Sequence, residues 1–169
     1  MTDQDQVVDH FELGNAAMGN NKYDVAVEEF REAVKINPDF AEAYNNMGLA
    51  LFNLSRFDEA VKEYENALRI VPDFALAYAN LGLAMLNKDL PDEAISILSK
   101  AVSLNPELAE VYYNLGIAYN KKGLTNEAIK AYEGFIEHAG DNYRNYVEGV
   151  VKIVSQLKAV AGVPVPPQS

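Results

Sequence analysis

Cysteine is absent from the 169-residue sequence, and lysine and arginine are scarce. Without cysteine the chain has no disulfide framework, no thiolate nucleophile and no cysteine-based zinc site. Fourteen lysine and arginine residues stand against 25 aspartates and glutamates, which gives a net charge of −11. Because an acidic body repels a phosphate backbone, the composition argues against a nucleic-acid partner.

Long apolar runs are also missing. The most apolar late stretch, residues 147–163, is interrupted by Glu148, Lys152 and Lys158, whereas a membrane-spanning helix needs roughly 20 apolar residues in succession. The first residues, MTDQDQVV, contain aspartate but no lysine or arginine, which is the wrong charge for a secretory or transit signal. The sequence therefore predicts a cytoplasmic protein without membrane insertion.

Motifs that carry chemistry are lacking as well. The sequence contains no GxxxxGK[ST], HExxH, GxSxG or EF-hand pattern. Its two histidines, His10 and His138, are interpreted as structural, and the carboxylates of Glu28, Glu29 and Glu32 are interpreted as a solvated helix face. We therefore expect a non-catalytic protein with no cofactor and no metal site.

What the sequence does contain is a 34-residue repeat. One unit cannot bury its own apolar face, so a constant period of this length indicates a stack of repeats. Residues 41–74 and 75–108 match without insertion, in the pairs Tyr44–Tyr78, Gly48–Gly82, Ala60–Ala94, Ala67–Ala101 and Pro72–Pro106. Residues 7–142 as a whole divide into the units 7–40, 41–74, 75–108 and 109–142.

Each repeat is expected to form two antiparallel helices. Positions 4, 7, 8 and 11, counted from the first residue of each unit, have the spacing of one helix face and are predicted to pack. The small residues Gly48 and Ala60 let the two helices approach closely. Ser55, with Asp58 three residues later, is predicted to form a capping box that opens the second helix.

The segments that flank the repeats have different compositions. Residues 1–6 are polar and are expected to be loose. Residues 143–161 are predicted to form a helix that caps the last repeat, and its apolar arc is wider than a one-sided cap requires. Residues 162–169 include VPVPPQS and are predicted to form a flexible, proline-rich tail.

The repeated pattern of an aromatic residue, Leu-Gly or Met-Gly, Ala, Ala and Pro resembles the tetratricopeptide repeat. The resemblance covers residues 7–142 in four consecutive units. It implies an all-α, right-handed superhelical solenoid of helix-turn-helix repeats, followed here by the capping helix. It also implies that the first helix of each repeat lines a concave groove.

Positions 2, 5, 6, 9, 12 and 13 lie on the side of the first helix opposite the packing positions. They are rich in asparagine, whose amide can pair with both the C=O and the N–H of a peptide, and in exposed apolar residues that favour binding. We predict that the groove is lined by Asn15, Asn45, Asn46, Leu49, Phe52, Asn53, Asn80, Leu83, Leu86, Asn87, Asn114 and Ile117.

Family members that bind chaperones grip a C-terminal carboxylate with cations, and this sequence has Phe11, Leu76 and Asn80 at those positions. The sequence thus predicts a scaffold or adaptor that binds a protein or peptide segment by another chemistry. The alternative is a homo-oligomer that assembles through residues 143–161 or through the tail.

Overall fold

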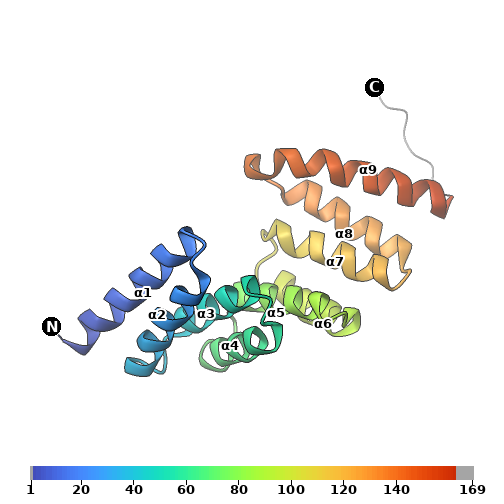
Figure 1. Cartoon of the computed structure of the whole chain (residues 1–169). Coiled ribbons are helices and arrows are strands. Elements are labelled where there is room, and N and C mark those ends of the chain that lie inside the picture. The colour runs from blue at the N-terminus through green and yellow to red at the C-terminus, as the bar shows by residue number, and fades with distance from the viewer. Residues whose placement is uncertain (1, 163–169) are drawn as a thin grey trace.

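The computed structural model describes residues 2–162, which form a stack of antiparallel helix pairs (Figure 1). No strand occurs within this range, and the predicted all-α solenoid is confirmed. The tail predicted for residues 162–169 lies, apart from Gly162, outside the described residues. The elements are α1 (Asp3–Gly19), α2 (Tyr23–Ile36), α3 (Ala41–Asn53), α4 (Phe57–Ile70), α5 (Ala75–Asn87), α6 (Pro91–Leu104), α7 (Ala109–Lys121), α8 (Thr125–His138), the 3-10 helix η1 (Asp141–Tyr143) and α9 (Arg144–Ala161).

A glycine at position 8 brings the two helices of each repeat together. An ideal Cβ placed on Gly48 would lie 2.6 Å from Cε1 of Tyr64, which is buried in α4. Since real Cβ atoms do not tolerate so close an approach, only glycine fits this contact. The same contact recurs in the other repeats, between Gly14 and Phe30, Gly82 and Leu98, and Gly116 and Tyr132.

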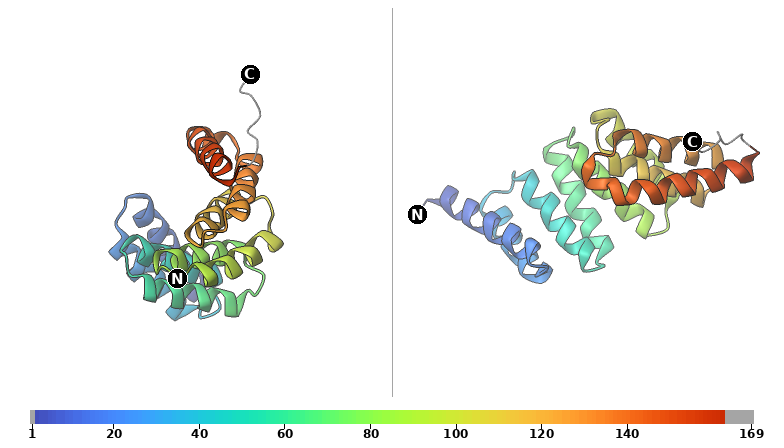
Figure 2. Two further views of the ribbon diagram at one scale, coloured as in Figure 1. Left: turned by 90° about the vertical axis from the view of Figure 1, so that its right-hand side faces the viewer. Right: turned by 90° about the horizontal axis from the view of Figure 1, so that it is seen from above.

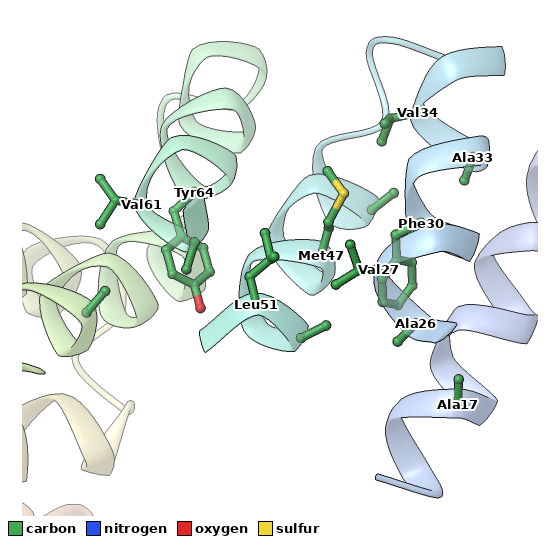
Figure 3. Close-up of a cluster of buried hydrophobic side chains, with 14 of the residues drawn as sticks. Ala17, Ala26, Val27, Phe30, Ala33, Val34, Met47, Leu51, Val61 and Tyr64 are labelled. Carbon is green, nitrogen blue, oxygen red and sulfur yellow. The ribbon is translucent and has the colours of Figure 1, made fainter. Parts of the chain in front are cut away.

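Neighbouring repeats stack through a second side of the first helix. Figure 3 shows Met47 of α3 directed toward α2, near Val27. Positions 3, 7 and 10, which we call the stacking positions, are covered in this way by the preceding repeat. Their residues are at most 7% exposed in the second to fourth repeats: Ala43, Met47, Ala50, Ala77, Leu81, Ala84, Val111, Leu115 and Ala118. Positions 3 and 10 were not among the predicted packing positions, which allowed for only one packed side.

The predicted capping box at Ser55 and Asp58 does not form in the turn between the two helices of the repeat. Ser55 has φ 60°, in the left-handed region, and Arg56 occupies the N-cap of α4 without a side-chain cap hydrogen bond. The Arg56 N–H instead donates to the Leu51 carbonyl and closes the end of α3. Ser55 is therefore a helix terminator, as are the residues at the same place in the other repeats: Asn21, Asp89 and Gly123.

The N-terminus also differs from the expectation of a loose segment over residues 1–6. Helix α1 begins at Asp3, because Thr2 and Asp5 cap its first turn reciprocally. The Thr2 side chain accepts from the Asp5 N–H at 3.2 Å, and the Asp5 carboxylate accepts from the Thr2 N–H at 2.7 Å. This capping box satisfies two amides that would otherwise lack partners.

At the other end, α9 packs on α8. Val150 and Val154 are the buried residues of α9, and Lys158 pairs with Glu133 of α8 at 2.7 Å. Tyr146 and Val151, which belong to its apolar arc, are 66% and 37% exposed. The apolar arc of α9 is thus wider than its contact with α8. Within residues 2–162, no helix combines the length and the apolar character needed to cross a membrane.

Candidate functional site

The predicted groove residues lie on α1, α3, α5 and α7, but they are not equally accessible. Asn15, Asn53 and Asn87 are exposed, and six others are half-buried: Asn46, Leu49, Phe52, Asn80, Leu83 and Ile117. Asn45, Leu86 and Asn114 are only 2%, 6% and 9% exposed. The surface made by positions 6 and 9 of these four helices is called the amide face below.

Burial of Asn45 and Leu86 corrects the prediction for two positions of the repeat. Position 5 (Asn45) and position 12 (Leu86) are seven residues apart, so both lie on the same side of their helix. Leu86 packs with Val111 and Leu115 of the next repeat, and Phe52, also at position 12, packs on Phe57 with ring centroids 5.2 Å apart. Asn45 and Leu86 therefore fill the space between elements and do not line an accessible surface.

Four of the predicted amides bind one another in a directional chain. Asn80 Nδ2 donates to Asn45 Oδ1 at 2.9 Å, Asn45 Nδ2 donates to Asn46 Oδ1 at 3.2 Å, and Asn46 Nδ2 donates to Asn15 Oδ1 at 3.0 Å. The chain joins the first three repeats through their first helices. These amides therefore hold adjacent repeats together, and their contact with a ligand stays a prediction.

Asn53 and Asn87 also have partners within their own helices. Their Nδ2 groups donate to the carbonyls of Leu49 and Leu83, at 2.8 Å and 2.9 Å. Each asparagine is the last residue of its helix, where carbonyls lack helical partners. Their role is to close α3 and α5.

Asn114 is different from the other amides of this face. It is 9% exposed, and its side chain makes no hydrogen bond to any residue in the range 2–162. The reason lies in the preceding repeat: Asn46 and Asn80 find partners at positions 9 and 5 of the repeat before them, whereas Asn114 finds Leu83 and Ala79 there. A nearly buried amide without a partner is costly, yet no fully buried polar side-chain atom in the described range lacks a partner. The Asn114 amide therefore still opens to the surface.

The turn before α9 bounds the amide face at α7. The Tyr143 hydroxyl donates to the Glu110 carboxylate. Burial, followed by this contact with Glu110, raises the pKa of Tyr143 to about 12, so the hydroxyl keeps its proton. Tyr143 also packs on Phe135 with ring centroids 5.7 Å apart. Sequence reasoning assigned Tyr143 only to the cap and gave Glu110 no partner, since nothing local links residues so far apart.

The carboxylates of the α2 cluster are engaged in pairs. Glu29 Oε2 lies 2.8 Å from His10 Nδ1, Glu28 pairs with Arg31 at 2.5 Å, and Glu32 pairs with Lys35. No cluster of three or more metal-ligating side chains exists in the part of the chain that the structure describes. The distinctive chemistry of this surface is therefore that of amides and aliphatic side chains.

Comparison with known proteins gives consistent matches. A family model described as tetratricopeptide repeat matches residues 11–75 and 46–108, and another with the same description matches residues 97–130. A crystal structure of MamA is 30% identical with a TM-score of 0.73, over 78% of this chain and 77% of MamA. No curated protein sequence matches the chain.

Two further solved structures share the fold at lower identity. MamA from Desulfovibrio magneticus RS-1 is 21% identical with a TM-score of 0.75, over 94% of this chain and 90% of that chain. YrrB, described as a TPR protein with an unusual peptide-binding site, is 21% identical with a TM-score of 0.69, over 89% of this chain and 76% of that chain. At these identities the likeness concerns the fold alone.

Proposed function

The chain belongs to the tetratricopeptide repeat family of protein-interaction scaffolds, and we propose that it binds an extended segment of a partner protein across the amide face at α5 and α7. The family is generally non-catalytic, in keeping with a binding role. The observation that carries the proposal is Asn114, a residue only 9% exposed whose amide opens to the surface without a partner in the range 2–162.

A peptide main chain supplies what Asn114 lacks. A primary amide both donates and accepts, and one peptide unit offers a carbonyl and an N–H. Asn80 can contribute as well, because its Nδ2 donates to Asn45 while its own Oδ1 accepts from no residue in the range 2–162. An extended segment of the partner lying across α5 and α7 would continue the amide chain where the protein's own residues end it.

The aliphatic residues at position 9 give this main-chain contact a side-chain preference. Leu49, Leu83 and Ile117 are half-buried, and each lies on a successive first helix. Adjacent packed helices are about 8–10 Å apart, and one turn of an extended polyproline II segment, which has three residues, spans about 9 Å and returns the side chains to the same face. We therefore expect a partner segment with an apolar residue at every third position.

Charge favours a partner segment that is basic. Glu12, Glu42 and Glu110 are exposed on the first helices of three repeats, and the whole chain carries a net charge of −11. Such a field speeds the encounter with a cationic segment and weakens as salt rises.

Neither the absence of a nucleic-acid partner nor a cytoplasmic location is tested by these observations, and both stay predictions.

Selection from a library of random 12-residue peptides displayed on phage tests the proposal. Immobilised full-length chain should enrich peptides with apolar residues at every third position. Asn114→Ala should lower the affinity for the enriched peptides about tenfold, which is the free-energy contribution of one desolvated hydrogen-bonding group. Val25→Glu is the matched control, because Val25 lies exposed on α2 and the same position carries Glu59 in the next repeat. Equal binding to the Asn114→Ala variant would contradict the proposal.

A further inference from the structure

Helix α1 presents a stacking side that no other helix of the described chain covers. At the stacking positions of the first repeat, Asp9 and Ala16 are exposed and Leu13 is 54% exposed. The residues at the same positions in the three later repeats are at most 7% exposed. Asp9 also stands where the later repeats have Ala43, Ala77 and Val111. This surface can still stack on a helix, but on one that supplies a cation for Asp9.

Helix α9 presents such a surface at the opposite end. Val151 is 37% exposed, and it lines a shallow cavity of about 550 Å³ together with Val147, Glu148, Lys152, Ser155 and Gln156. Two of the α9 cations are already engaged, since Arg144 pairs with Asp141 at 3.2 Å and Lys158 pairs with Glu133 at 2.7 Å. Lys152 is exposed and makes no ion pair within residues 2–162.

The charges of the two helices select one pairing. Helix α1 carries four carboxylates, Asp3, Asp5, Asp9 and Glu12, and no lysine or arginine. Helix α9 carries three cations, Arg144, Lys152 and Lys158, and one carboxylate, Glu148. A contact of α1 with α1 brings like charges together, whereas α1 against α9 sets Asp9 against Lys152, the α9 cation without an ion pair in the described range.

We infer that α9 of one copy stacks on α1 of a second copy, with Val151 against Leu13 and Lys152 beside Asp9. The two helices lie at opposite ends of the molecule (Figures 1 and 2), so one copy does not satisfy its own ends. A head-to-tail contact of this kind is heterologous and builds an open chain of copies. It continues the stacking of repeats from one molecule into the next and leaves the amide face free.

Sedimentation velocity on the full-length chain tests the inference. Two helices bury less surface than a standard stable interface, so we expect weak association, with the average mass rising above the monomer's 18.7 kDa between about 10 μM and 1 mM and falling again in high salt. Leu13→Glu and Val151→Glu should each remain monomeric over this range. Val25→Glu, on the outer side of α2, should associate like the wild type.

Mixing separates a head-to-tail contact from a symmetric one. Leu13→Glu keeps a functional α9 surface and Val151→Glu keeps a functional α1 surface, so their equimolar mixture should form a complex of twice the monomer mass and nothing larger. Lys152→Asp alone should also be monomeric, and adding Asp9→Lys in the same chain should restore association. Circular dichroism establishes that each variant is folded. If Val151→Glu is unfolded, Lys152→Asp replaces it as the variant with a blocked α9 surface, because Lys152 is exposed.

Three results would overturn the inference. They are a wild type that stays monomeric at about 1 mM, association that survives Leu13→Glu, and a mixture of the two blocked variants that forms no complex.

Discussion

Gly48 allows a direct test of how the two helices of a repeat are held together. A Cβ at this position would lie 2.6 Å from the Tyr64 ring, and Tyr64 is only 1% exposed, so the ring has no space into which it can withdraw. Overpacking a closed core costs about 1–3 kcal/mol, and so short a contact places Gly48→Ala near the upper end. Alanine recovers about 1 kcal/mol of helix propensity. The expected net loss is about 2 kcal/mol of unfolding free energy.

Gly149 provides the control for this substitution. It lies inside α9, and no heavy atom comes within 4 Å of a Cβ placed there. Gly149→Ala should therefore raise the unfolding free energy by about 0.5–1 kcal/mol. Urea denaturation followed by circular dichroism measures both changes, and the Gly48 variant should also melt about 4–8 °C lower than wild type.

The outcome that would refute this reasoning is a Gly48→Ala variant stabilised like the Gly149 variant. A double-mutant cycle sharpens the result, because truncating Tyr64 to alanine removes the clash. In that background, Gly48→Ala should no longer destabilise the protein. A destabilisation that persisted there would mean that Tyr64 is not the group responsible.

Three further substitutions test other features of the structure by urea denaturation. Asn45→Ala should cost about 1–3 kcal/mol, because it breaks the amide chain and leaves the Asn80 donor unpaired; an unchanged midpoint would show that the chain contributes nothing. Ser55→Gly should gain about 0.5 kcal/mol, because it relieves a side chain held at φ 60°; a loss would contradict the turn geometry. Lys88 holds the pKa of the Asp58 carboxyl below its ordinary value of 3.8, so the pair stabilises the fold above that pH and ceases to do so as the pH falls through the lowered pKa. Lys88→Met should thus lower the midpoint at pH 7 and leave it unchanged at about pH 2, and an equal loss at both values would exclude the pair as the cause.

Prediction from the sequence succeeded where a contact recurs at a fixed separation along the chain. Small residues such as Gly48 and Ala60 recur with the period, so the close approach of the two helices was predicted, and the contact of Gly48 with Tyr64 confirms it. Family membership and the all-helical fold followed from the same regularity and are also confirmed. The repeat boundaries and the cytoplasmic location remain predictions.

Prediction failed where two repeats meet. Asn45 and Asn46 are adjacent in the sequence, and both were assigned to the groove, but only Asn46 reaches the surface. The helical period places them about 100° apart, and the angle at which one repeat stacks on the next decides which of the two is covered. No pattern within a single repeat contains that angle.

The sequence by itself thus determined the repeat, its helix pairs, the acidity of the chain and the amide-rich character of the first helices, because these depend on residue type and on local spacing. Only the tertiary structure decided that four amides bind one another while Asn114 is left without a partner. The loss of hydrogen-bonding residues at Ala79 and Leu83 is visible in the sequence. That this loss deprives Asn114 of a partner follows only from the tertiary structure, which places those positions beside Asn114. A hydrogen bond between repeats depends on atoms that the superhelix, and not the local chain, brings together.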